Sequence, residues 1–278
     1  MKILVTNDDG YNYKGLQVLV EMLRPWGDLV VIGPKYHQSG MSMAVSMGMK
    51  PIAVKKLREE PGAEWWYLDA TPSSCVKWAL DEVYTDGLPD LIVSGINHGA
   101  NTASAALYSG TLGAAQEGAL AGVLSVGVSL DSFDRDADFS VVREHFLSIL
   151  KGIMDNRSEK FGIYYNVNFP NLPLELIKGV KFARQGTQHW IKEFRPYDYG
   201  FFERNGLKPS DLGVAGFPEV EEGEKVYMMV GDLVGDPRND AFCDNILLEQ
   251  GYVTITVHNI DSTDYQELSR LSQCGITL

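Results

Sequence analysis

Two adjacent carboxylates stand directly behind the first apolar run of the chain. Asp8 and Asp9 follow residues 3–5, a run typical of a buried strand, and Gly10 marks the turn that ends it. Two negative charges at the end of a buried strand repel each other and resist desolvation, and a divalent cation would compensate them most simply. Asp also favours turns and helix caps, so one Asp capping a helix while the other faces water explains the pair alone equally well.

Two more oxygen-bearing side chains follow other predicted strands. Ser39 lies in the segment KYHQSGMS behind the second strand, and Asn97 lies in the loop SGINHGAN behind residues 91–93. Because the carboxyl ends of parallel strands meet at one crevice, the two carboxylates, the hydroxyl and the amide should come together there. Such an all-oxygen set suits Mg²⁺ or Mn²⁺, whereas zinc prefers histidine or cysteine. We interpret the neighbouring His37 and His98 as loop or substrate-contact residues rather than ligands.

A predicted helix start offers a place for an anion. Ser109, Gly110 and Thr111 introduce a segment rich in glycine and alanine that is predicted to be helical over residues 111–122. Backbone N–H groups and hydroxyls at a helix N-terminus bind phosphate, although ordinary capping by Thr111 is the simpler explanation of these residues alone. Asn101 belongs to the same continuous stretch and can converge on this helix start.

A metal site and an anion cradle on one crevice together predict hydrolysis of a phosphate ester. A metal there would lower the pKa of a bound water, which Asp8 or Asp9 would orient or deprotonate, and the cradle would stabilise the phosphoryl oxygens in the transition state. Two alternatives stay open. One is a phosphatase with an Asp nucleophile, for which an Asp-x-Asp pattern is typical, and the other is a regulator that binds metal and nucleotide without turnover.

Apolar runs and helical stripes alternate over the first 170 residues, which predicts an α/β fold with a mostly parallel sheet and helices on both faces. Strands are expected at residues 3–5, 29–32, 91–93, 123–130 and 164–169. Helices are expected at residues 16–23, after Pro72 with Ser73 or Ser74 as the cap, at 111–122 and at 142–153. No G-x-G-x-x-G motif follows the first strand, so a Rossmann dehydrogenase is not expected.

The character of the sequence changes from about residue 186 to 240. Six aromatic residues crowd into 190–202, together with glycine, proline and charged residues, and residues 225–234 are predicted to form one strand. We expect a single α/β domain with its core at about 1–185 and 241–278 and an extended arm or hairpin at about 186–240. The arm aromatics can pack on the protein's own core or on a second subunit, and we favour the second. Residues 252–257 should return to the sheet and 265–274 should form a final helix.

Composition limits the classes of function. The 278 residues carry a formal net charge of −13 and show no basic stripe, which argues against a nucleic-acid polymer as partner. The three cysteines, Cys75, Cys243 and Cys274, are widely spaced, which suits a reducing compartment and gives no zinc spacing. No stretch approaches the ~20 apolar residues of a membrane span, and the N-terminal segment does not resemble a signal peptide. We therefore expect a cytoplasmic protein without membrane contact.

Four short motifs, in order along the chain, resemble the SurE (survival protein E) family of 5′/3′-nucleotidases: NDDGY, QSG, SGIN-x-G-x-N and YSGT. The resemblance implies a Rossmann-like core, an arm used in homodimers or homotetramers, and a phosphatase that needs one divalent metal ion, Mg²⁺ or Mn²⁺. Its substrates would be nucleoside 5′- and 3′-monophosphates. The family's metal ligands correspond to Asp8, Asp9, Ser39 and Asn97, and its phosphate contacts to Asn101, Ser109, Gly110 and Thr111.

The chain departs from the family pattern at several places that lie outside those eight positions. Tyr13-Lys14 stands where Ala-Pro is usual before the first helix, and Val257-His258 replaces Pro-Leu after the last strand. Because no predicted metal ligand is altered, the expected activity is unaffected by these changes. They bear instead on which nucleotide is preferred and on how subunits associate.

Overall fold

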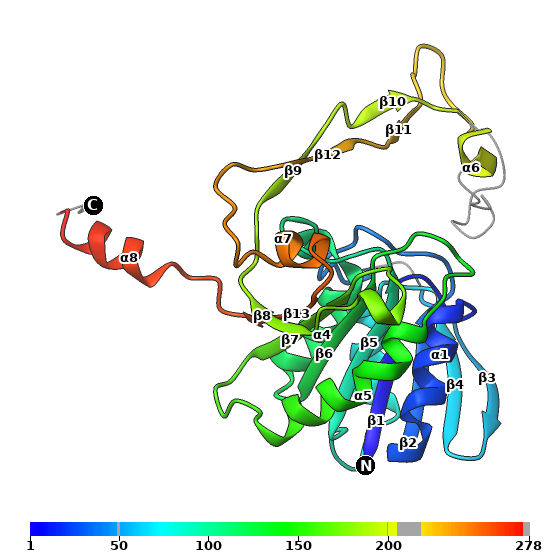
Figure 1. Ribbon diagram of the computed structural model, residues 1–278. Helices are drawn as coiled ribbons and strands as arrows, with labels where there is room; N and C mark the ends of the chain where they lie inside the picture. Colours follow the sequence, from blue (N-terminus) through cyan, green and yellow to red (C-terminus); the bar gives the residue numbers. More distant parts are fainter. Residues whose placement is uncertain (49–50, 199, 205–217, 275–278) are drawn as a thin grey trace.

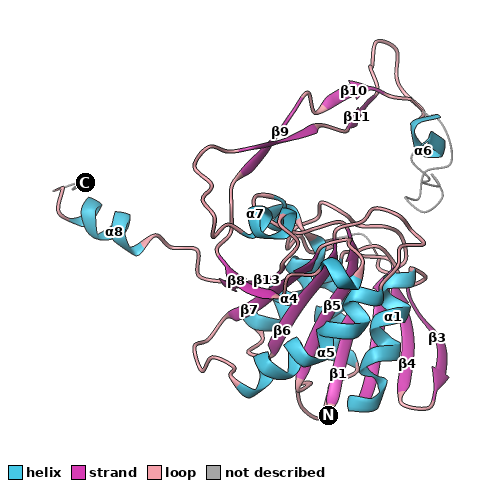
Figure 2. Cartoon of the chain, in the orientation of Figure 1, coloured by secondary structure: helices cyan, strands magenta, loops and turns pink. Residues whose placement is uncertain are grey.

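A nine-stranded sheet forms the centre of the molecule, with helices against both of its faces (Figure 2). The computed structural model describes residues 1–48, 51–198, 200–204 and 218–274. The strands lie in the order β3-β4-β2-β1-β5-β6-β7-β13-β8. The run from β4 to β7 is parallel: β4 (Ala63–Leu68), β2 (Asp28–Pro34), β1 (Lys2–Thr6), β5 (Leu91–His98), β6 (Leu124–Leu130) and β7 (Ile163–Phe169).

Antiparallel strands flank this parallel core. β3 (Val54–Glu60) pairs with β4 as a hairpin, and β13 (Val253–Asn259) pairs antiparallel with β7 and parallel with β8 (Val180–Ala183). The chain moves from β1 to β2 on one side and later returns to β5 on the other side of β1. The strand order therefore reverses between β1 and β5, which is the position where open α/β sheets bind ligands.

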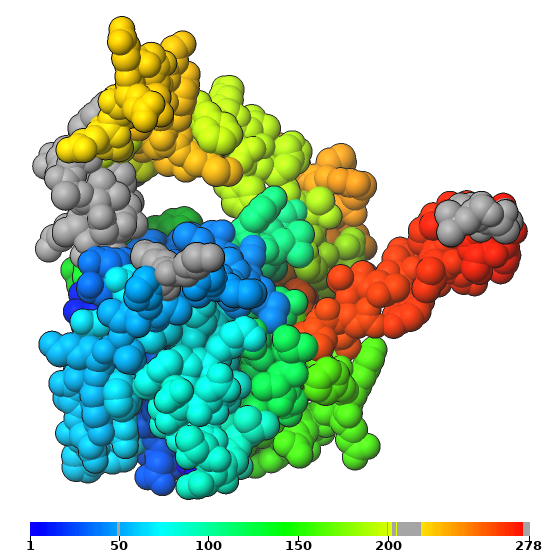
Figure 3. Space-filling view, turned by 180° about the vertical axis from the view of Figure 1, so that it is seen from behind, coloured from blue at the N-terminus to red at the C-terminus, as the bar shows by residue number. Residues whose placement is uncertain are grey.

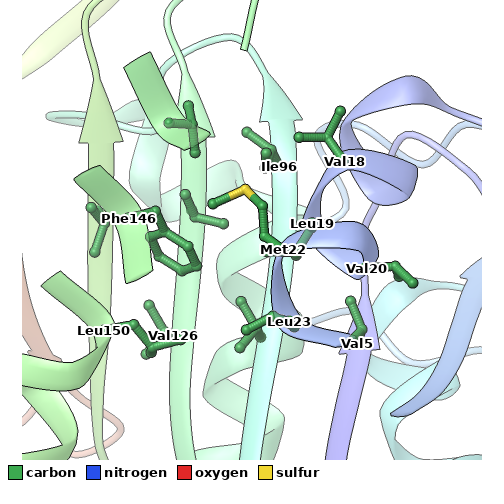
Figure 4. Close-up of a cluster of buried hydrophobic side chains, with 14 of the residues drawn as sticks. Val5, Val18, Leu19, Val20, Met22, Leu23, Ile96, Val126, Phe146 and Leu150 are labelled. Atoms are coloured by element: carbon green, nitrogen blue, oxygen red, sulfur yellow. The ribbon is translucent and has the colours of Figure 1, made fainter. Parts of the chain in front are cut away.

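Successive apolar side chains along each strand point to opposite faces of the sheet, so a hydrophobic cluster forms on each face. In β1, Ile3 and Val5 belong to one hydrophobic cluster and Leu4 to another, as the pleat requires. The first cluster includes α1 (Lys14–Leu23) and α5 (Ser140–Asp155), and Figure 4 shows side chains of α1 meeting Phe146 of α5 over the sheet. The second cluster packs α2 (Pro72–Glu82) and α4 (Gly110–Leu120) on the opposite face. The predicted α/β architecture with helices on both faces is confirmed.

The arm is a long hairpin whose two short ladders lie outside the main sheet. β9 (Gln188–Ile191) pairs with β12 (Asp232–Gly235), and β10 (Phe194–Pro196) pairs with β11 (Tyr227–Met229). It projects from the end of the sheet at which the parallel strands finish, and α6 (Gly200–Arg204) lies at its far end (Figure 1). The single strand predicted for residues 225–234 is wrong, because β11 and β12 pair with different partners and are separated by Val230 and Gly231.

The final helix, α8 (Tyr265–Ser272), projects away from the body of the protein, and Figure 3 shows it standing clear of the sheet layers. Short elements complete the fold: α3 (Ala105–Tyr108), α7 (Asp244–Glu249) and the 3₁₀ turns η1 (Arg24–Trp26) and η2 (Leu174–Leu176). Among the helices of the described residues, none has the length and apolar character needed to cross a membrane.

Two local predictions are corrected by the structure. The cap of α2 is Thr71 rather than Ser73 or Ser74: its side chain accepts a hydrogen bond from the Ser74 N–H, and Pro72 occupies the first helical turn. Asn97 lies within β5 rather than in a loop behind it, because the strand continues to His98 through a register shift between Ser94 and Asn97.

Candidate active site

The loops after β1, β2 and β5 meet at the reversal of strand order. Gln38 of the loop behind β2 donates its N–H to the Asp8 carbonyl oxygen (2.8 Å). Thr111 of α4 donates its hydroxyl to Asp8 Oδ1 (2.6 Å), and the His98 N–H of β5 reaches Asp9 Oδ2 (3.2 Å). The ends of β1, β2 and β5 are thus joined through Asp8 and Asp9, the first by its backbone carbonyl oxygen as well as its carboxylate.

Both carboxylates are buried, at 3% exposure for Asp8 and 1% for Asp9. Burial is the main cause that raises the pKa of Asp8 to about 6, and the neighbouring charge of Asp9 raises it further, while hydrogen bonds from Thr111 act in the opposite direction. A nearby positive charge would therefore stabilise the ionised form of the pair.

Two buried side-chain oxygens at this point have no hydrogen-bond partner: Asp9 Oδ1 and Asn97 Oδ1. Asn97 uses its N–H₂ group on the Gly99 carbonyl oxygen (2.7 Å), which fixes the amide and leaves its oxygen free. A buried acceptor without a donor is costly, and a cation satisfies it. The irregularity in β5 re-aims this part of the strand, and Gly95 is required there because a Cβ would lie 2.2 Å from the Val128 carbonyl oxygen.

Histidines support the carboxylate pair, a role that sequence reasoning missed. His98 is nearly buried, and its Nδ1 lies 2.8 Å from Asp9 Oδ2, while His37 Nδ1 lies 3.5 Å from Asp9 Oδ1. The position of His98 directly after Asn97 was the available signal. No group of three or more His, Cys, Asp or Glu side chains suited to a metal occurs in the part of the chain that the structure describes.

The start of α4 lies against Asp8. Ser109 is the N-cap, and its Oγ accepts a hydrogen bond from the Leu112 N–H (3.0 Å), so the cap is Ser109 rather than Thr111. Gly110 permits the close approach, because a Cβ there would lie 2.9 Å from Asp8 Cβ and 3.0 Å from Asp8 Oδ2. Ser109, Gly110 and Thr111 are therefore beside the carboxylates, with the Thr111 hydroxyl already engaged by Asp8.

Ser39 and Asn101 occupy different settings. Ser39 is exposed, one residue beyond the Gln38 hydrogen bond to Asp8. Asn101 is buried, and its amide donates to Ser129 Oγ (2.9 Å) while its backbone N–H donates to Asn168 Oδ1 (2.7 Å). The structure thus places the Ser39 turn next to the backbone of Asp8, and it holds Asn101 in a network that includes β6 and β7.

Comparison with known proteins adds an independent line of argument. The family model described as Survival protein SurE matches residues 3–192. The protein named 5′-nucleotidase SurE from Christiangramia forsetii is 34% identical over 276 residues, which is 99% of this chain and 96% of that protein. The one of the same name from Caldanaerobacter subterraneus is 32% identical and covers 99% and 98% of the two chains. The crystal structure of the SurE protein from Aquifex aeolicus superposes with a TM-score of 0.75 at 27% identity, covering 99% of each chain.

Proposed function

Because this chain belongs to the survival protein SurE family, we propose that it is a metal-dependent nucleotidase that hydrolyses nucleoside 5′- and 3′-monophosphates to nucleoside and phosphate. One observation carries the metal dependence. Both carboxylates of the Asp8–Asp9 pair are buried. Asp9 Oδ1 and the side-chain oxygen of Asn97 accept no hydrogen bond. This donor set fits a hard divalent cation, Mg²⁺ or Mn²⁺, held by Asp8, Asp9, Asn97 and the hydroxyl of Ser39.

A divalent ion bound there would supply charge neutralisation of the phosphoryl group and a more acidic water. The remaining work falls to the chain itself. His98 holds Asp9 in place, and Thr111 holds Asp8, so that either carboxylate can orient the attacking water. Ser109 Oγ accepts a hydrogen bond from the Leu112 N–H, so the Ser109 hydroxyl can still donate its own proton to an anion. The Gly110 N–H, at the same helix start, would donate to the same anion.

Exposed apolar side chains support the association of subunits. We propose that α8 and the arm form contacts in a homodimer or homotetramer. Tyr265, Leu268 and Leu271 of α8 share one helix face and are exposed, as are Phe194 and Tyr227 of the arm. Trp190 instead packs edge-on against Tyr108 of the same chain, so the arm aromatics divide between the two settings. Light scattering of the purified chain tests this, and a monomer at micromolar concentration would contradict it. A cytoplasmic location stays a prediction from the sequence.

The test is phosphate release from a panel of nucleoside 5′- and 3′-monophosphates with Mn²⁺, with Mg²⁺ and after chelation. We expect multiple turnover that chelation abolishes and added metal restores. A trapped phosphoaspartate would favour an Asp nucleophile instead. Nucleotide binding without phosphate release under any metal would replace the enzyme with a regulator.

A further inference from the structure

A hollow lies beside Asp9, between the loops that follow β1 and β2. Its volume is about 190 Å³, and Asp9 and His37 belong both to its lining and to the carboxylate cluster. This is below the roughly 300–1,000 Å³ of sites that take a whole drug-sized ligand. The hollow therefore suits one ring system whose attached sugar and phosphate lie outside it, toward Asp9 and α4.

The walls of the hollow are mainly aromatic. Tyr11, Tyr13, Tyr36 and His37 line it, and the Tyr13 and His37 rings lie 5.8 Å apart. Tyr11 is supported from behind by Tyr67, whose ring lies 5.3 Å from its own. Aromatic walls with a polar rim bind flat heteroaromatic rings by stacking, as nucleotide-binding surfaces do.

Tyr13 gives this wall a feature of its own. It replaces the small alanine of the family pattern, it is buried, and its ring also contacts His98 at 5.6 Å. The guanidinium of Arg135 lies 4.5 Å from the centre of the Tyr13 ring, so the side chain is held from the outer side as well. The substitution thus places a fixed and largely covered aromatic ring directly beside the carboxylate site.

The charge of the lining argues against a second phosphate in the hollow. Its one lysine, Lys35, lies over the Tyr36 ring at 4.9 Å and 3.7 Å from the carboxylate of Asp69. Asp9 is also part of the lining. With the cation shared among these partners, the hollow presents no net positive charge to an anion, whereas an uncharged base requires none.

We propose that this hollow is the nucleobase subsite, in which the base stacks among the tyrosines while the phosphate lies at the start of α4. Asn12 lies at the exposed mouth, and its carboxamide can both donate to and accept from the edge of a base. The inference rests on the proposed nucleotidase function, because it assigns the part of the substrate that does not react.

The experiment compares adenosine 5′-monophosphate with ribose 5-phosphate, which has the same phosphate and sugar but no base. Tyr36→Leu removes one stacking surface, and Tyr252→Leu, at a similarly half-buried tyrosine beside β13, is the matched control. We expect Tyr36→Leu to lower kcat/KM for the nucleotide by roughly tenfold, mainly through KM, because stacking contributes about 1–3 kcal/mol per base. The value for ribose 5-phosphate should change less than twofold, and the control should alter neither.

Two results would overturn the subsite. An equal loss on both substrates would assign Tyr36 a merely structural role, and no loss on either would show that the base lies elsewhere. Failure of the proposed function is separate, since it appears as no phosphate release from any substrate by the unaltered protein. Equilibrium binding of adenosine 5′-monophosphate in the presence of Mn²⁺ then decides: binding weakened by Tyr36→Leu and not by Tyr252→Leu supports the subsite, and equal binding by both variants refutes it.

Discussion

Two buried aspartates lie near the same end of the sheet, and they differ in how many of their oxygens accept hydrogen bonds. Asp244, at the start of α7, is 0% exposed and accepts hydrogen bonds from the backbone N–H groups of Ala103, Gly186 and Asn245 at 2.8–3.1 Å. Asp9 is almost as deeply buried, at 1% exposure, but it has a second carboxylate next to it and one oxygen that accepts no hydrogen bond.

The difference separates a structural carboxylate from one that awaits a ligand. Burial raises the pKa of both Asp244 and Asp8, but three backbone donors oppose the rise at Asp244, whereas Asp9 adds to the rise at Asp8. Asp244 joins the loop behind β5 to the base of the arm at Gly186 and completes its own bonding. We propose that a cation completes the Asp8–Asp9 pair. Burial does not distinguish Asp244 from the Asp8–Asp9 pair, but the hydrogen-bond donors around each carboxylate do.

The largest expected effect is that of Asp9→Asn. It removes one negative charge and one metal ligand, so we expect kcat/KM to fall more than about 100-fold, since metal stabilisation is worth several kcal/mol and each 1.36 kcal/mol is tenfold. The charge of Asp9 is one of the causes that raise the pKa of Asp8 from 3.8 to about 6, and a buried carboxyl with a raised pKa destabilises the folded state at neutral pH. The metal-free variant should therefore be more stable than the unaltered protein at pH 7.

Thermal unfolding with and without Mn²⁺ provides the second measurement. The unaltered protein should gain about 2.7 kcal/mol at roughly 100 times the dissociation constant, and Asp9→Asn should gain little at the same concentration. Asp244→Asn is the matched control, because all three N–H donors reach Oδ1 of Asp244, which asparagine retains. If Mn²⁺ stabilised Asp9→Asn as much as Asp244→Asn, Asp9 would not be a metal ligand.

The second effect concerns stability. Asp244→Ala leaves three buried N–H groups without an acceptor, so we expect unfolding to become easier by about 3 kcal/mol, with Asn costing about 1 kcal/mol. Metal-induced stabilisation should persist in both variants. Urea unfolding at pH 7 measures this, and an Ala variant as stable as the unaltered protein would show that the network around Asp244 does not hold the loop.

The sequence predicts the parallel core and the carboxylate site because both depend on local patterns. Apolar runs of strand length report burial directly, and polar residues at their ends fall at one edge of the sheet whatever the detailed packing. The edge hairpin β3–β4 was missed, since β3 is mostly charged and exposed. It is held by pairing to β4 and by the Arg58 guanidinium, which lies 3.9 Å from the centre of the Trp65 ring.

What could not be predicted depends on contacts distant in sequence. The polar run around Asn97 indicates a loop, yet β6 pairs with it and extends β5 by several residues. The support of Asp9 by His98 spans 89 residues, and that of Ala103 by Asp244 spans 141. Such contacts form only once the sheet has assembled, so no local pattern contains them.

The smallest effect tests whether an unpartnered buried atom always marks a ligand site. His258 of β13 pairs with Tyr164 at the start of β7, and its ring stacks on the Tyr164 ring at 5.1 Å. Its Nε2 is buried without a partner, and burial lowers the pKa of His258 to about 4. We interpret His258 as a structural histidine whose burial costs little at pH 7, because its ring is neutral at that pH.

His258→Phe keeps an aromatic ring and removes the titration. A histidine whose pKa falls from 6.5 to about 4 on folding loses stability as pH falls below 6.5, so the unaltered protein should lose about 2 kcal/mol relative to His258→Phe between pH 7 and pH 5. Asp8 contributes with the opposite sign, but equally in both proteins, so the difference isolates His258. Urea unfolding at the two pH values measures it, and kcat/KM at pH 7 should be unchanged. A loss of activity in this variant would mean that the unpartnered Nε2 of His258 also serves the reaction. Counting hydrogen-bond donors would then not be enough to tell a ligand-binding group such as Asp9 from a structural one such as Asp244.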